Sequence, residues 1–264
     1  MFYLLKMKNK FLSLYNYLKF LNYKPYKLSS ILFPSSNYSD FFIYDSECFK
    51  NIFITENSYG LLEARDIDVI HSFKFYDQKG GLIKEYNKKS KKLIETIDLP
   101  SIKSNFKYLS FTHEIKNISC LIKKENKKIK LNSRGYTKYK YRKESIGSIV
   151  HGNFGAVSSK ISASIQRKSK FCYTPIFRFQ KTDVYHLVFN NPTNNSLEIE
   201  IIECNENKEN KFTKKLFLKT LGLDYIELRN FDSSISFISN LPICRCLIFK
   251  NPFRQSYNMD VFHS

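Results

Sequence analysis

Asp68-Val69-Ile70-His71 is the stretch from which the fold can be predicted, because it recurs as Asp183-Val184-Tyr185-His186. In both copies a leucine, Leu82 or Leu197, lies eleven residues beyond the histidine, with a polar cluster of turn-forming residues in between. Aromatic and β-branched residues around such a cluster are typical of a strand, a turn and a second strand. The chain ends with a third relative, Asp260-Val261-Phe262-His263. The recurrence predicts a duplicated all-β architecture.

Other short segments have the composition of strands, since they are rich in β-branched and aromatic residues and are bounded by polar turns. Residues 197–201 alternate apolar and acidic side chains, which is typical of a half-buried strand. The remaining candidates are residues 41–44, 52–55, 69–76, 107–112, 184–189, 214–221 and 247–250. Their regular spacing predicts a mainly β protein with two related, Ig-like β-sandwich modules.

The first residues have a different pattern. Leu4, Met7, Phe11 and Leu14 begin a 3-4-3-4 spacing that places apolar side chains on one helix face, and Pro25 ends it. We expect a basic amphipathic helix over residues 1–24 and a linker over 25–40. The first β module is then predicted over 41–120, a lysine-rich linker over 121–133, and the second β module over 134–264.

The predicted helix leaves two interpretations open. It docks on the β modules, or residues 1–23 make a peripheral contact with an anionic membrane. No apolar run approaches the ~20 residues of a transmembrane helix, so we expect no integral membrane segment. The expected location is cytoplasmic, with peripheral membrane attachment as the alternative.

The formal net charge is +19, from 43 basic and 24 acidic residues, and most of the basic residues are lysines. Lys, Asn, Ile, Phe and Tyr have A/T-rich codons, so a biased genome composition accounts for much of this excess. Proteins that recognise nucleic acid favour arginine for bidentate contacts, and arginine is the minority cation here. The charge is nevertheless compatible with an anionic polymer as partner.

The six cysteines are scattered, and Cys244-Arg245-Cys246 has no second ligand pair at zinc-site spacing. We interpret the cysteines as reduced and expect no cofactor and no metal. The alternative is a three-histidine metal site formed by His71, His186 and His263. Duplication is the competing explanation for these histidines, because equivalent strands carry equivalent packing residues.

A basic and aromatic stripe is the first candidate for ligand binding. Its members alternate with Thr137, Tyr139 and Tyr141, so on an extended strand they share one face. They are Arg134, Tyr136, Lys138, Lys140 and Arg142. Cations on this face would meet anionic groups, and the Tyr136 ring would stack on a base or a sugar. The alternative is a solvated edge strand that lysines protect from aggregation.

His151-Gly152-Asn153-Phe154-Gly155 is the second candidate. Its two glycines let the backbone approach a ligand closely, and His151 and Asn153 supply polar groups. The alternative is a tight turn between strands. No G-x-S-x-G elbow, Walker A loop, G-x-G-x-x-G fingerprint or H-E-x-x-H motif accompanies it.

These observations favour a non-catalytic binding or assembly protein over an enzyme. The expected partner is an anionic polymer, a polysaccharide or another protein, including a second copy of the chain. One alternative is an enzyme that acts on a surface glycan through the His151 loop. The other is a nucleic-acid-binding protein that uses the strand over residues 134–142.

Overall fold

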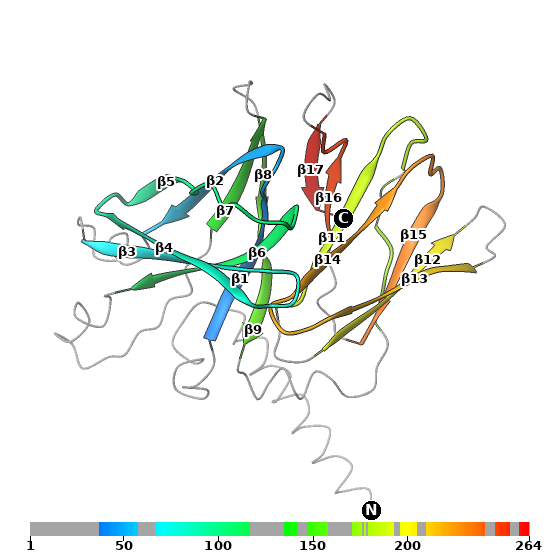
Figure 1. The fold of residues 1–264 in the computed structure, drawn as a ribbon, viewed down its shortest axis with the longest axis horizontal. Helices are drawn as coiled ribbons and strands as arrows, with labels where there is room; N and C mark the ends of the chain where they lie inside the picture. The colour runs from blue at the N-terminus through cyan, green and yellow to red at the C-terminus, as the bar shows by residue number, and fades with distance from the viewer. Residues whose placement is uncertain are drawn as a thin grey trace, which may run out of the picture.

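The structure, a computed structural model, describes residues 37–57, 67–116, 135–141, 147–157, 171–175, 177, 179–192, 196–204, 210–240, 246–253 and 259–263. The chain is mainly β in this part, as predicted, and its strands form four antiparallel sheets. Figure 1 shows the N-terminal strands, blue to green, beside the C-terminal strands, yellow to red.

The N-terminal strands form two sheets that face each other, here called the first module. Sheet A has the order β4-β3-β6-β1-β9, with β1 (Asn37–Asp45), β3 (Val69–Tyr76), β4 (Leu82–Ser90), β6 (Tyr108–Lys116) and β9 (Asn153–Val157). Sheet B has the order β5-β2-β7-β8, with β2 (Phe49–Glu56), β5 (Ile94–Asp98), β7 (Gly135–Tyr141) and β8 (Gly147–His151). Phe42 and Phe111 of sheet A share one core with Phe53 and Ile97 of sheet B.

The C-terminal strands form the second module in the same manner. Sheet C has the order β10-β15-β12-β13, with β10 (Phe171–Tyr173), β12 (Leu197–Cys204), β13 (Asn210–Leu218) and β15 (Ser234–Ser239). Sheet D has the order β14-β11-β16-β17, with β11 (Tyr185–Asn190), β14 (Leu223–Leu228), β16 (Leu247–Lys250) and β17 (Asp260–His263). Ile199 and Phe237 of sheet C share a core with Leu187 and Ile248 of sheet D.

The two modules repeat one strand order. The series β4-β3-β6-β1 matches β13-β12-β15-β10, and the series β5-β2-β7-β8 matches β14-β11-β16-β17. Strand β9, which pairs with β1, extends sheet A of the first module. The described strands therefore carry a duplication at the level of topology.

The recurring D-V-x-H stretch does not mark equivalent strands of this duplication. His71 lies in β3, which corresponds to β12, whereas His186 lies in β11, which corresponds to β2. The first copy continues into a hairpin, β3 and β4, whose turn has Gly80 at a φ of 82°. The second copy connects β11 of sheet D to β12 of sheet C, so each copy contains two successive strands, but the two copies are not equivalent in the fold.

A third core cluster joins the modules. It combines Ile43 and Tyr108 of sheet A, and Tyr139 of sheet B, with Val188 and Phe249 of sheet D. Strand β11 is consequently buried on both faces, one against sheet C and one against the first module. This explains why residues 185–189 form a continuous apolar run interrupted only by His186, since strands buried on both sides do not alternate.

Strand pairing differs from the predicted domain boundaries. Strands β7 and β8 pair in sheet B with β2, and β9 pairs with β1, although residues 134–157 were expected in the second module. The lysine-rich segment suggested a boundary, but pairing between distant strands is invisible in local composition. The expected linker over 25–40 is also too long, because β1 begins at Asn37. The predicted helix over 1–24 and linker over 121–133 lie outside the described residues.

The charged stretch from Lys84 to Lys92 is largely strand β4, an exposed edge of sheet A. In the described part of the chain, no helix has the length and apolar character to cross a bilayer. The thiols of Cys48 and Cys246 are buried, and that of Cys172 is exposed.

Candidate binding face

Strand β7 presents the predicted stripe to solvent. Tyr136 is 49% exposed, and Lys138 and Lys140 are half-buried, while Thr137 and Tyr139 between them are buried. The alternation follows from the two-residue period of a strand. The alternative of a protected edge strand is wrong, because β7 lies between β2 and β8.

The register of sheet B brings the stripe next to His151. Tyr136 is the direct cross-strand partner of His151, and Lys138 is the partner of Ile149. Directly opposed residues of antiparallel strands project to the same side of the sheet. Tyr136 and His151, which belonged to two separate sequence candidates, are therefore neighbours on one solvent face.

On the other side of β7, Lys140 is the partner of Lys50 in β2, and Lys50 forms an ion pair with Asp98 over 2.6 Å between Nζ and Oδ2. The β7–β8 face is defined here by Lys50, Tyr136, Lys138, Lys140, Ile149 and His151. Within the described part of the chain, Lys138 and Lys140 take part in no ion pair. The face thus combines positive charge with an exposed ring and the 55% exposed side chain of Ile149.

The C-terminal strand of the second module borders this face. The rings of His151 and His263 stack with centroids 4.3 Å apart and planes 28° apart. Nε2 of His263 donates to the carbonyl oxygen of His151 over 2.6 Å, and Nδ1 of His151 donates to the carbonyl oxygen of Gly152 over 3.0 Å. Further contacts join Ser148 of β8 to Asp260 and Val261 of β17.

Gly152 occupies the corner where the chain leaves sheet B and enters sheet A. A Cβ atom there would lie 2.8 Å from the carbonyl oxygen of Phe41 and 2.8 Å from the Phe42 ring. The glycine is needed for this close packing, which agrees with the interpretation of the His151 loop as a tight turn. Asn153 begins β9 and pairs with Phe41. Arg134 and Arg142 lie outside the described residues.

The three histidines of the alternative metal site do not meet, since each has different partners. His71 faces His113 of β6, with Nδ1 and Nε2 3.0 Å apart and ring centroids 5.2 Å apart. His263 stacks on His151, and His186 lies at the junction of the modules. No group of three or more His, Cys, Asp or Glu side chains in the described ranges is arranged to hold a metal ion.

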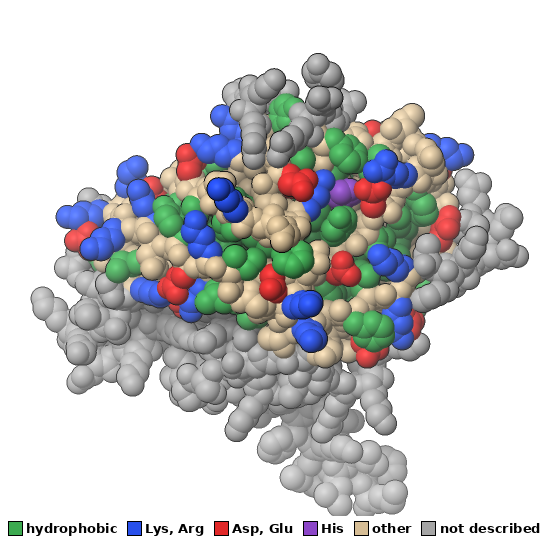
Figure 2. All heavy atoms as spheres, in the orientation of Figure 1, with side chains coloured by type: hydrophobic (Ala, Val, Ile, Leu, Met, Phe, Trp, Pro, Cys, Tyr) green, Lys and Arg blue, Asp and Glu red, His purple; other side chains and the backbone are tan. Residues whose placement is uncertain are grey.

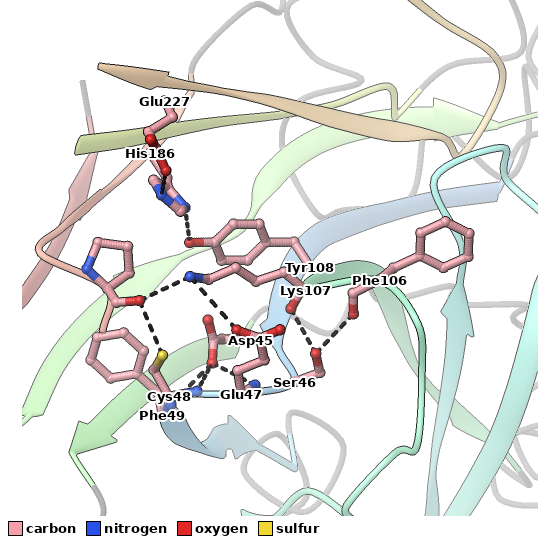
Figure 3. A network of polar contacts seen from close by, with 11 residues as sticks. Asp45, Ser46, Glu47, Cys48, Phe49, Phe106, Lys107, Tyr108, His186 and Glu227 are labelled. Carbon is pink, nitrogen blue, oxygen red and sulfur yellow. Dashed lines mark hydrogen bonds and ion pairs between the residues drawn. The ribbon is translucent and has the colours of Figure 1, made fainter. Parts of the chain in front are cut away.

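His186 is the centre of a polar network between the modules (Figure 3). Its Nε2 donates to Oε2 of Glu227 over 3.0 Å, and its Nδ1 accepts a proton from the Tyr108 hydroxyl over 2.9 Å. Burial and the nearby Lys107 ammonium lower the pKa of His186 to about 4, although Glu227 opposes the shift. Neutral histidine can satisfy both neighbours at once, because one ring nitrogen donates and the other accepts.

Lys107 and Asp45 extend the network within the first module (Figure 3). Nζ of Lys107 donates to the carbonyl oxygen of Pro252 in the second module over 2.9 Å. Oδ1 of Asp45 accepts the backbone N–H groups of Glu47, Cys48 and Phe49. Burial raises the pKa of Asp45, and these hydrogen bonds counteract the rise.

The junction network joins the two modules through buried polar groups. Tyr108 is fully buried, and the His186 side chain is only 3% exposed. Burial also raises the pKa of Tyr108 well above its ordinary value, which keeps the hydroxyl a proton donor.

Sequence reasoning missed Tyr108, His113 and Glu227, the partners of His186 and His71. These residues lie on distant strands that the fold brings together, and nothing in their local sequence distinguishes them from ordinary strand residues. The signal that could have found them is polarity at core-facing positions, because a buried histidine requires a hydrogen-bonding partner.

The fold and the face define a mainly β protein of two topologically matched modules with a cationic and aromatic surface strand. No protein-family model matches the chain, and no curated protein is significantly similar to it.

Proposed function

We propose that this protein is a non-catalytic binding protein that holds an anionic polysaccharide on its β7–β8 face. The observation that carries the proposal is the cross-strand register of sheet B. It places Tyr136, His151 and two lysines, Lys138 and Lys140, on the same side of the sheet. Among the described residues, these two lysines form no ion pair. We also propose that both modules are Ig-like sandwiches. Two facing antiparallel sheets around one core support that assignment.

The chemistry of the face suits an acidic sugar polymer. The ammonium groups of Lys138 and Lys140 would form charge-assisted hydrogen bonds with carboxylate or sulfate groups. The exposed Tyr136 ring offers its flat side to the C–H face of a sugar ring. Ile149, also exposed, adds apolar contact area beside Lys138. Exposed apolar groups among polar ones are typical of interaction sites.

Nucleic acid is the competing partner, and the described part of the face favours the polysaccharide. Its cations are lysines, which act as point charges, whereas phosphate recognition favours the bidentate arginine fork. Figure 2 shows acidic, basic and hydrophobic side chains interspersed on one side of the molecule, without a continuous basic surface there. The net charge of +19 therefore does not identify nucleic acid as the partner.

An enzyme acting through His151 has less support. The described contacts of its ring are the Gly152 carbonyl oxygen and the His263 ring. A general base needs a hydrogen-bonded nucleophile or an orienting acid, and neither contact provides one. A protein partner, a second copy, a membrane contact through residues 1–23 and the cytoplasmic location remain predictions from the sequence.

The test compares retention of the protein on a polyuronate matrix with retention on an uncharged glucan. Lys138→Glu with Lys140→Glu should weaken polyuronate binding at least tenfold. The matched control is Lys88→Glu with Lys89→Glu, which changes the net charge equally at exposed positions of β4. The control should retain most of the binding.

Two results would overturn the proposal. Equal losses in both double variants would mean that only net charge matters. Retention by single-stranded nucleic acid but not by polyuronate would establish the competing partner, with its steep dependence on salt.

A further inference from the structure

The β7–β8 face continues into the second module. Tyr136 of β7 and His151 of β8 lie on paired strands of sheet B, and the His151 ring stacks on His263 of β17, the edge strand of sheet D. The three rings form a row that crosses from strand to strand. Lys138 and Lys140, in contrast, follow Tyr136 along the single strand β7. Strands β8 and β17 hold corresponding places in the two modules, and each ends in one of the stacked histidines.

We propose that His263 is part of the binding face, so that one ligand chain spans both modules; this rests on the proposed function of the β7–β8 face. The ligand is then a run of several sugars of an acidic polysaccharide. A single uronic acid or a short dimer is too small to contact the lysines and all three rings.

Dimensions support a ligand of this length. Paired strands such as β7 and β8 lie about 4.8 Å apart. The His151 and His263 ring centroids are a further 4.3 Å apart, so the row of three rings extends roughly 9 Å from strand to strand. Lys140 lies four residues along β7 from Tyr136, or roughly 13 Å at about 3.3 Å per residue. One sugar ring cannot bridge either separation, but an extended oligosaccharide can follow them.

Contacts between β17 and strand β8 of the first module hold His263 in place before any ligand arrives. Its Nε2 donates to the His151 carbonyl oxygen over 2.6 Å, and Ser148 Oγ accepts the backbone N–H of Val261 over 3.2 Å. Val261 is also buried in the core cluster that joins the modules. A preformed ring avoids much of the entropy that binding would otherwise lose.

The test measures dissociation constants for uronic acid oligomers of increasing length by calorimetry, beginning with the dimer. His263→Gln keeps an N–H donor for the His151 carbonyl and removes the ring, whereas His263→Phe keeps an aromatic ring and removes the donor. Phe217→Ala removes another exposed ring of the second module, 64% exposed on β13, and is the control. Urea unfolding of each variant verifies that the modules remain folded.

We expect affinity to increase with oligomer length in the unmodified protein. His263→Gln should weaken binding of the longest oligomers about tenfold, as the loss of a stacking ring does elsewhere, and should leave the dimer unaffected. His263→Phe and Phe217→Ala should bind like the unmodified protein.

The failures of the two proposals are distinguishable. If Tyr136→Ala weakens binding but His263→Gln does not, the ligand is confined to the first module and the inference on His263 is wrong. If His263→Phe is weak while His263→Gln binds like the unmodified protein, the hydrogen bond matters and the ring does not, which also overturns it. If neither Tyr136→Ala nor His263→Gln has an effect, the β7–β8 face itself is not the binding site.

Discussion

Tyr108 of the first module donates its hydroxyl proton to Nδ1 of His186 in the second module over 2.9 Å, and both side chains are buried. Residues far apart in the sequence are thereby joined at the junction of two β modules. The His186 ring also stacks on Tyr225, with centroids 5.0 Å apart. The junction is consequently specified by polar geometry as well as by the apolar cluster that surrounds it.

Tyr108→Phe should destabilise the protein by about 1–3 kcal/mol, because it leaves Nδ1 of buried His186 without its donor. The ring and its packing on Phe249 are retained, so the change in the free energy of unfolding reports the loss of the hydroxyl group alone. Urea unfolding measures the change in the free energy of unfolding. Tyr136→Phe, at an exposed position of β7, is the control and should change it by less than about 0.5 kcal/mol. Equal stability of Tyr108→Phe and the unmodified protein would show that the hydrogen bond is not maintained in solution.

Acidification should destabilise the fold through His71, His113 and His186. Burial lowers the pKa of His71, lowers that of His113 well below its ordinary value, and lowers that of His186 to about 4. The unfolded chain then binds more protons than the folded one below the ordinary histidine pKa of about 6.5. Stability from these groups is present above pH 6.5 and is lost as the pH falls toward 4.

Urea unfolding at several pH values between 7 and 4 measures this loss. His186→Gln supplies the comparison, since an amide can donate to Glu227 and accept from Tyr108 without titrating in this range. Between pH 7 and 4 the unmodified protein should lose roughly 2 kcal/mol more than the variant. Parallel pH profiles for the two proteins would mean that His186 is not held in its neutral form.

The sequence predicts individual strands better than it predicts their arrangement. The alternation over residues 197–201 identifies β12, and the aromatic run over residues 69–76 identifies β3. Both are recognisable because the burial of a strand on one or both faces determines which positions are apolar. Strands β5, β8, β9, β10, β14 and β15 were missed. Strand β15, Ser234–Ser239, has serine at two of its three outward positions and at its buried end, which makes it resemble a loop. Pairing of β7 with β2 depends on contacts between distant residues, so no local pattern reveals it.

The candidate site was predictable in its parts and not in its assembly. The alternation of Tyr136, Lys138 and Lys140 with buried residues follows from the strand period and was found from the sequence. The pairing of Tyr136 with His151 depends on the register of β7 and β8, and the approach of His263 depends on how the two modules dock. Register and docking are set by the complete core, which a local pattern does not contain.

Gly152→Ala should cost about 1–3 kcal/mol of stability, because the added methyl group would overlap the Phe41 carbonyl oxygen and the Phe42 ring at 2.8 Å. The backbone atom cannot move without disturbing the pairing of β1 with β9. Thermal unfolding followed by circular dichroism measures the loss. Unchanged stability would indicate that the corner between sheets B and A is looser than its packing implies.

The modules make a second contact where the β3–β4 turn meets residues 220–222. Substitution of Gly80, which lies in this turn, tests that contact. The backbone N–H of Leu223 donates to the carbonyl oxygen of Gln78 over 3.1 Å, and a Cβ on Gly80 would lie 2.0 Å from the Thr220 carbonyl oxygen. Gly80 also has a φ of 82°, which is unfavourable for residues with a side chain. Gly80→Ala therefore combines backbone strain with a collision between modules.

The neighbouring Gly81 supplies a matched control. A Cβ on Gly81 would meet the carboxylate of Asp77 at 2.8 Å, and its three nearest atoms all belong to this side chain of the first module. Gly80→Ala should destabilise the protein by at least about 1 kcal/mol more than Gly81→Ala, since strain at positive φ alone costs about that much. Urea unfolding of both variants measures the difference. If the two alanine variants were equally stable, the β3–β4 turn would not hold the modules together, and docking would depend on the His186 network and the apolar cluster alone.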